Sequence, residues 1–201
     1  MHPEAERLFA LDEALRAEAD QVLAESGIGA ILEQTGYVPV GSYAMHTMTW
    51  RDLDFELYTD PDWDAHWEIG TRLAKTGWCF RLACDDESRY GDPIMCGLYW
   101  GLRVAEPGRG GFRKDDGVYW KMDLWRAPLA VFDAHAGERR RRWQALMADE
   151  LRSYILAIKE AVCLMPEYRR TIASVQIYEA VLEHGIRDLQ AFREWHQLSS
   201  P

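Results

Sequence analysis

The sequence predicts an α+β fold in which a mixed β-sheet, flanked by helices, precedes a C-terminal helical subdomain. In the first two thirds of the chain, several short segments alternate apolar and polar residues, which is typical of strands with one buried face. From about Gly137 onward, apolar residues recur only at helical spacing. The pattern changes near Pro128, so we expect an α+β domain over residues 1–127 and a helical subdomain over residues 128–201.

Local patterns predict the individual elements. A helix from Pro3 to about Ser26 is expected because its leucines recur at helical spacing and a proline is tolerated in a first turn. A second helix should follow residues 60–62, where Asp60 or Asp62 can cap it, and should end before Gly77. The other expected elements are a short segment through 31–32, strands at 37–40, 52–58, 78–82, 94–104 and 118–125, a helical stripe over 143–162, and helices at 168–183 and 187–196.

Charge and composition exclude several classes of protein. The chain carries 33 acidic against 23 basic side chains, a net charge of −10. A duplex- or tRNA-binding surface needs basic side chains to neutralise phosphates, so this balance disfavours a nucleic-acid partner. No apolar run approaches the roughly 20 residues that span a bilayer, and the first residues lack the layout of a signal peptide. The four cysteines have neither zinc-site nor disulfide-framework spacing. We therefore expect a soluble, cytoplasmic protein without a membrane partner.

The segment from Asp52 to Tyr58 combines strand periodicity with an acidic face. Its apolar residues point one way, and Asp52, Asp54 and Glu56 point the other. The first two carboxylates lie about 7 Å apart at Cα in a strand, close enough to share bound metal ions. Three acids on one strand face repel one another, so a purely structural role would cost stability without a return.

Further candidate residues lie before and after this strand. Gly41-Ser42 follows a predicted strand, where a glycine lets the backbone approach a ligand closely and a serine offers donors to phosphate. Asp123 stands on the polar face of a later strand and can supply a third carboxylate. Lys121, on the same face, could contact phosphate or pair with an acid. Mg²⁺ prefers such hard oxygen ligands.

These residues resemble the signature of the DNA polymerase beta-type nucleotidyltransferase superfamily. The signature is an apolar residue, Gly-Ser, a nine-residue gap and then Asp-apolar-Asp-apolar, here Val40-Gly41-Ser42 followed by Asp52-Leu53-Asp54-Phe55. The sequence Arg51-Asp52-Leu53-Asp54 in particular resembles the motif of small antibiotic nucleotidyltransferases that act on lincosamides and aminoglycosides. Asp54-Phe55-Glu56-Leu57 also fits the pattern, so the metal pair could be Asp52 and Asp54 or Asp54 and Glu56.

The resemblance implies a nucleotidyltransferase core and a set of roles. Asp52, Asp54 and Asp123 would bind Mg²⁺, as two ions, with Glu56 as an added ligand or a base. Gly41, Ser42 and Lys121 would hold a nucleoside triphosphate such as ATP. Superfamily members also hold the triphosphate from the helical side. Lys159 is the candidate there, although an ordinary helix edge is the alternative.

The implied reaction is transfer of a nucleoside monophosphate to a hydroxyl of a small, antibiotic-like acceptor, with release of pyrophosphate, as in antibiotic resistance. Two alternatives stay open: a transferase that modifies a protein in a toxin–antitoxin setting, and a catalytically silent, nucleotide-binding regulatory module of the same fold. The base preference and a homodimer that completes the site are also open.

Overall fold

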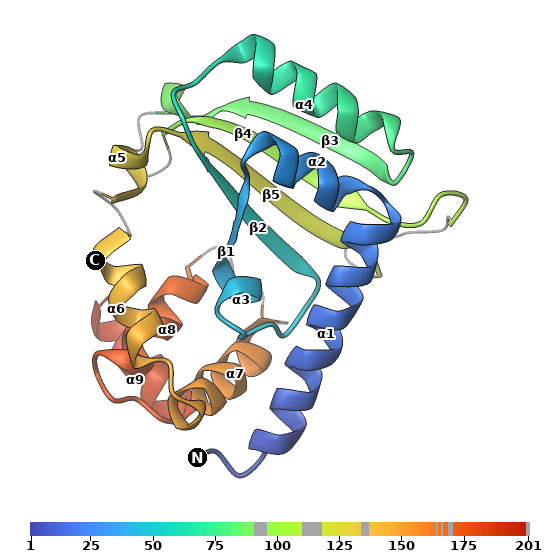
Figure 1. The fold of residues 1–201 in the computed structure, drawn as a ribbon. Coiled ribbons are helices and arrows are strands. Elements are labelled where there is room, and N and C mark those ends of the chain that lie inside the picture. Colours follow the sequence, from blue (N-terminus) through green and yellow to red (C-terminus); the bar gives the residue numbers. More distant parts are fainter. Residues whose placement is uncertain are drawn as a thin grey trace. The chain divides into compact units, whose positions relative to one another are not determined.

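The structure is a computed structural model that describes residues 1–90, 96–109, 118–133, 137–163, 165, 167–168 and 171–199. In these residues a five-stranded sheet has the order β1-β2-β5-β4-β3, in which β2 and β5 are parallel and the other pairs are antiparallel (Figure 1). The strands are β1 (Val38–Val40), β2 (Asp52–Tyr58), β3 (Cys79–Asp86), β4 (Leu98–Val104) and β5 (Trp120–Ala127). The predicted α+β class with a mixed sheet is confirmed.

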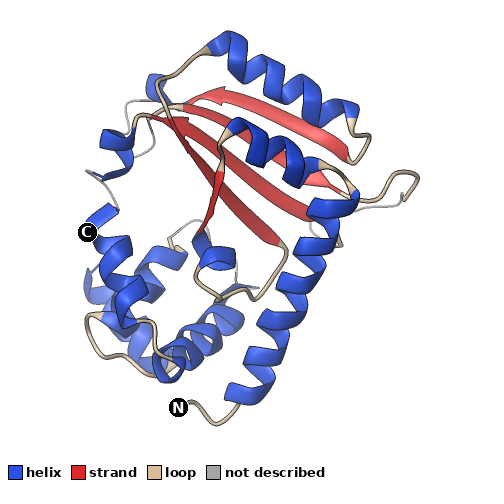
Figure 2. Ribbon diagram, viewed as in Figure 1, coloured by secondary structure: helices blue, strands red, loops and turns tan. Residues whose placement is uncertain are grey.

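Helices precede, interrupt and follow the sheet (Figure 2). They are α1 (Ala5–Glu25), α2 (Ile28–Thr35), α3 (Gly41–Ala44), α4 (Trp63–Lys75), α5 (Leu129–Phe132), α6 (Glu138–Leu146), α7 (Asp149–Cys163), α8 (Ser174–Leu182) and α9 (Leu189–Ser199), with a short 3-10 helix at Glu87–Arg89. The predicted first helix is confirmed as α1. The predicted cap is also confirmed, because the Asp62 carboxylate accepts the backbone N–H of Ala65 at 3.1 Å at the start of α4.

The chain divides into two compact units. The sheet unit comprises Arg16–Ala44 and Arg51–Gly137, and the helical unit comprises Met1–Leu15, Met45–Trp50 and Glu138–Pro201. This division concerns contacts within the folded chain, and the domains expected at 1–127 and 128–201 stay a prediction.

The sheet unit has its core on one face of the sheet. Leu53 and Phe55 on β2, Met122 and Leu124 on β5 and Leu102 on β4 are buried, as strand alternation requires. Figure 1 shows α2 and α4 packed against the sheet, and α4 buries its own apolar stripe there. The residues between these core positions point to the opposite face, where the acidic side chains lie.

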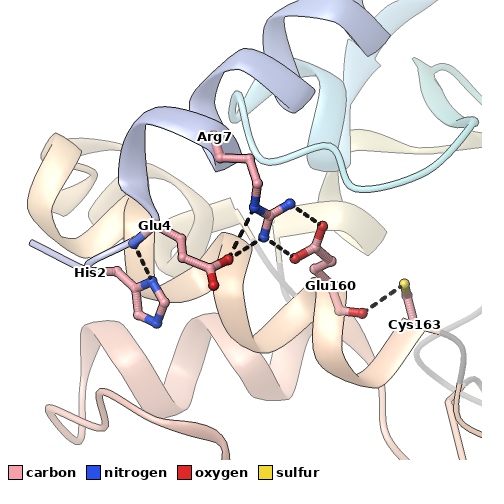
Figure 3. Close-up of polar contacts among 5 residues, drawn as sticks. All are labelled: His2, Glu4, Arg7, Glu160 and Cys163. Carbon is pink, nitrogen blue, oxygen red and sulfur yellow. Dashed lines mark hydrogen bonds and ion pairs between the residues drawn. The ribbon is translucent and has the colours of Figure 1, made fainter.

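The helical unit has a separate apolar core. Lys159 on α7 is buried within this unit, and its ammonium donates to the backbone carbonyl of Thr47 at 2.7 Å. An ion pair connects two helices at the surface of this unit. Arg7 of α1 donates to both carboxylate oxygens of Glu160 of α7, at 2.8 and 2.6 Å (Figure 3). The core residues that the unit contributes include Met45, Trp143, Ile155, Ile158, Val162, Ile172, Ile177, Tyr178, Ala180, Val181 and Phe192.

Three predicted elements have different bounds in the structure. The helical stripe over 143–162 is not one helix, since α6 ends at Leu146 and α7 begins at Asp149. The helix expected from Tyr168 begins only at Ser174, and Tyr168 instead forms an isolated β-bridge with Ile172. The strand expected from residue 94 is β4, which begins at Leu98, and residues 94–95 lie outside the described part of the chain.

Two smaller findings concern the membrane and the thiols. Across the part of the chain that the structure describes, no helix combines the length and the apolar character that crossing a bilayer requires. All four cysteines are free thiols, as their spacing predicts.

Packing of α4 on β4 depends on the absence of a side chain at Gly70. A Cβ there would lie 2.3 Å from the indole of Trp100, which is itself buried and donates its N–H to the His66 carbonyl at 3.1 Å. We expect Gly70→Ala to lower the free energy of unfolding by about 1–3 kcal/mol, because overpacking a rigid ring outweighs the better helix propensity of alanine.

Urea denaturation of the full chain measures this effect. Thr71→Ala, at the neighbouring exposed position of α4, is the control and should leave stability within about 0.5 kcal/mol. Equal stabilities of the two variants would show that Trp100 does not pack against α4 as described.

Candidate metal centre

Three carboxylates meet on the polar face of the sheet. The parallel pairing of β2 with β5 places Asp54 opposite Asp123, and Asp52 lies two residues before Asp54 on the same face. Each of the three offers a carboxylate oxygen that lies within 4.8 Å of the others, and all three side chains are half-buried. Among the described residues, this is the one group of three or more acids, histidines or cysteines with such spacing.

An ammonium group lies among these acids. Lys121 of β5 is opposite Asp52 in the register, and its Nζ donates to Asp52 Oδ1 at 2.9 Å and to Asp123 Oδ2. Burial opposes the positive charge, but the surrounding carboxylates outweigh burial and raise the pKa of Lys121. Lys121 therefore neutralises part of the repulsion among the acids.

Tyr99 of β4 completes the hydrogen bonding of the third acid. Its hydroxyl donates to Asp123 Oδ1 at 2.8 Å, and burial together with the Asp123 charge raises the pKa of Tyr99 well above its usual range. The hydroxyl fits there because Gly101 is opposite Asp123 in the register, and a Cβ on Gly101 would lie 2.6 Å from the tyrosine oxygen. Neither Tyr99 nor Gly101 was predicted as a site residue, although alternation along β4 places both on the face opposite Trp100.

The Gly-Ser turn adjoins the acidic strand. Gly41 follows β1 with a φ of 62°, and a Cβ there would lie 2.5 Å from Asp54 Oδ2. Only glycine fits this conformation and this approach without strain. Helix α3 begins at Gly41 itself, and Ser42 is buried in its first turn. The predicted neighbourhood of Gly41 and the paired acids is therefore found in the structure.

The start of β2 is fixed by an ion pair to α1. Arg51 donates to both oxygens of Glu18, at 2.6 and 2.9 Å, and the indole of Trp120 donates to the same carboxylate at 3.1 Å. The guanidinium holds the pKa of Glu18 below its usual value despite partial burial. These contacts anchor the first residues of β2 and β5 together, one residue before Asp52 and Lys121.

Two predicted site residues lie outside this group. Glu56 is buried on β2, where the Tyr58 hydroxyl donates to it at 2.9 Å, and it does not belong to the group of mutually close ligand oxygens. The grouping thus favours Asp52 and Asp54 over Asp54 and Glu56. Lys159 belongs to the helical unit, and its contact with Thr47 is local to that unit. The predicted functions of Glu56 and Lys159 stay predictions.

The donor set suits a hard divalent cation. Carboxylate oxygens are the ligands that Mg²⁺ takes, and one or two carboxylates plus phosphates and waters usually complete its shell. Half-burial leaves the three acids accessible to such additional ligands. A cation bound by Asp52 and Asp123 would compete with the Lys121 ammonium, which donates to both acids. The acidic triad could therefore bind a metal ion.

Comparison with known proteins gives a likeness in fold alone. No protein-family model matches the sequence, and no curated protein matches it. A solved cytoplasmic RNA terminal U-transferase matches over 92% of this chain and 56% of its own, with 12% identity and a TM-score of 0.50. The RNA terminal uridylyl transferase Cid1 matches over 90% of this chain and 53% of its own, with 13% identity and a TM-score of 0.52.

The chain spans a little more than half the length of these two structures, and identities this low carry no residue roles. Both are nucleotidyl-transferring enzymes by name, and each match extends over about nine tenths of this chain. The resemblance to lincosamide and aminoglycoside enzymes stays a prediction. The chain has the nucleotidyltransferase fold, with an acidic triad positioned to hold a metal.

Proposed function

We propose that the protein is a Mg²⁺-dependent nucleotidyltransferase that moves a nucleoside monophosphate from a triphosphate to a hydroxyl of a small acceptor, releasing pyrophosphate. The observation that supports this most is the convergence of Asp52, Asp54 and Asp123, with ligand oxygens within 4.8 Å of one another, on a nucleotidyltransferase fold. An acidic triad of this kind otherwise costs stability through mutual repulsion.

The residues of the proposed site divide into metal ligands and triphosphate ligands. Asp52, Asp54 and Asp123 would hold two Mg²⁺ ions. The turn at Gly41 and Ser42, in contact with Asp54, would hold the triphosphate. When bound, the ions would supply charge stabilisation for the attacking and the departing oxygens.

The reaction exchanges one phosphorus–oxygen bond for another. The acceptor hydroxyl oxygen attacks the α-phosphorus, its proton passes to Asp123, and the bond from the α-phosphorus to the bridging oxygen breaks, so that pyrophosphate leaves with its electron pair. Tyr99 and Lys121 donate to the two different oxygens of Asp123, which fixes the orientation of this carboxylate. Glu56 as a second base and Lys121 as a triphosphate ligand complete the proposal.

The acceptor we propose is a hydroxylated, antibiotic-like small molecule, with ATP as one candidate donor. A catalytically silent nucleotide-binding module is the second candidate function. The observation that favours it is the ammonium of Lys121 on Asp52 and Asp123, because a lysine in a cation position can replace a metal permanently. The following two experiments separate these functions.

Asp54 belongs to both possible metal pairs, so its substitution tests the site most directly. We expect Asp54→Asn to reduce metal-dependent pyrophosphate release by at least about 100-fold, because one lost carboxylate removes several kcal/mol of charge stabilisation. The assay supplies each nucleoside triphosphate, Mg²⁺ and a panel of aminoglycosides and lincosamides.

Asp60→Asn is the matched control, since Asp60 is an exposed acid just beyond the same strand. It should retain full activity, and both variants should keep the circular dichroism spectrum of the unsubstituted chain. Triphosphate binding without turnover by the unsubstituted chain would support the silent module or point to an acceptor outside the panel. A chain that binds no triphosphate, with or without Mg²⁺, contradicts both functions.

A substitution of Lys121 distinguishes a site that binds metal from a site that the lysine ammonium occupies permanently. We expect Lys121→Met to lower the melting temperature in chelator, because three acids then lack their cation, and to tighten the Mn²⁺ dissociation constant by about tenfold or more. Calorimetric titration with Mn²⁺ measures the affinity, and the Mn²⁺-induced rise in melting temperature should exceed that of the unsubstituted chain.

Lys75→Met, at an exposed position of α4, removes the same charge away from the acids and should change neither quantity by a comparable amount. Lys121→Arg should restore the stability in chelator. If Lys121→Met binds Mn²⁺ no more tightly than the unsubstituted chain, Lys121 does not compete with a metal at this site.

A further inference from the structure

We propose that Arg81 and Arg103 form a binding subsite for a phosphate group of the acceptor, so that the acceptor is a phosphorylated small molecule with an aromatic or heterocyclic ring. This inference rests on the proposed function and specifies its substrate class. It starts from the strands beyond the acidic triad, which the metal site does not use.

A row of charged side chains crosses the sheet beside the triad. Asp52 is opposite Lys121, Lys121 is opposite Arg103, and Arg103 is opposite Arg81. Because partners in register share a face, all four side chains point to the face of the triad. Three strand spacings of about 4.8 Å separate Asp52 from Arg81, or roughly 14 Å along the row. That distance suits an acceptor with its hydroxyl at the acids and its phosphate at the arginines.

The two arginines are like charges on neighbouring strands. Directly opposed like charges destabilise a sheet. Within the described residues neither guanidinium forms an ion pair, and the one hydrogen bond of Arg103 runs from Nη1 to the Leu102 carbonyl at 2.8 Å. The chain has 33 acids to offer, and arginines elsewhere, such as Arg51 and Arg142, are paired with them. Two opposed arginines that have no acid partner among the described residues favour an anionic ligand.

Aromatic rings lie beside the arginines. The Arg103 guanidinium lies over the ring of Tyr119, 5.7 Å from its centroid, and Phe80 meets Tyr119 edge-on at 5.5 Å. Phe80 stands at a register shift between Cys79 and Arg81, and half of its surface is exposed. A bulge on an edge strand turns side chains out of the regular alternation. The exposed ring gives a flat apolar surface next to the cations, which suits a ligand that carries a ring as well as a phosphate.

The subsite is connected to the triad through Tyr99. The charge of Arg103 acts on the Tyr99 hydroxyl, which in turn donates to Asp123. The arginines lie on β4 and β3, whereas Gly41 and Ser42 adjoin β1 and β2, on the other side of β5 in the strand order. If the triphosphate lies against Gly41, the arginines face the other reactant. A small phosphorylated ligand also agrees with the net charge of −10, which disfavours a nucleic-acid partner.

Direct binding tests this subsite without catalysis. Isothermal titration of the full chain in chelator, without triphosphate, uses three probes: inorganic phosphate, a nucleoside 5′-monophosphate and a short single-stranded RNA. We expect the monophosphate to bind, and Arg81→Gln and Arg103→Gln each to weaken it by about 10-fold or more, since each removes a charge-assisted hydrogen bond. Arg72→Gln, on α4 at the opposite face, should bind like the unsubstituted chain.

Stability supplies a second readout. Each arginine substitution relieves a like-charge contact, so the melting temperature without ligand should stay constant or rise, while the rise induced by the monophosphate is lost. Asp54→Asn should retain monophosphate binding. A failure of the catalytic proposal therefore leaves this measurement unchanged, and loss of turnover alone does not bear on the arginines.

Three results would overturn the inference. Monophosphate affinity that does not depend on Arg81 and Arg103 would remove the subsite. Displacement of the monophosphate by a triphosphate in a simple competition would assign the arginines to the donor. RNA that binds far more tightly than the monophosphate, and loses its affinity in the same variants, would make the acceptor a nucleic acid.

Discussion

The parallel pairing of β2 with β5 is the constraint on which the candidate site depends. It brings Asp52 and Lys121, 69 residues apart in sequence, within hydrogen-bond distance and places Asp54 opposite Asp123. A shift of one residue in this register would turn the acids of one strand toward the apolar core. The bidentate contact of Arg51 with Glu18, just before β2, and the bond from Trp120 to the same carboxylate, just before Lys121, hold both strand starts in place.

Concentrated negative charge is the cost of this arrangement, and Lys121 and Tyr99 offset it. Three half-buried carboxylates within 4.8 Å of one another repel strongly where water screens them little. The Lys121 ammonium and the Tyr99 hydroxyl each give Asp123 a donor, and Gly101 leaves the space for that hydroxyl. Gly41 leaves space for Asp54 in the same way. The site therefore depends as much on absent side chains as on the acids themselves.

Local sequence patterns predicted most of the secondary structure and part of the candidate site. Alternation in 52–58 and 118–125 predicted β2 and β5, and the Asp62 cap predicted the start of α4, because these features depend on neighbours in sequence. The pairing of β2 with β5 is non-local, so Asp123 could be proposed only as a candidate. Tyr99 and Arg103 were missed because the apolar partners in β4, such as Trp100, dominate its pattern. The late start of α8 was not predicted, because the bridge between Tyr168 and Ile172 leaves no trace in helical periodicity.

Along the row from Asp52 to Arg81, the charge on the polar face of the sheet changes sign across β5. Acids dominate on β2, Lys121 and Asp123 stand together on β5, and arginines without acid partners among the described residues occupy β4 and β3. A metal-dependent transfer needs such a division, because the cation must be held by acids while a phosphate-bearing reactant is repelled by the same acids and attracted by bases beside them. In a protein of net charge −10, this local reversal is the feature that would orient a phosphorylated acceptor toward the triad.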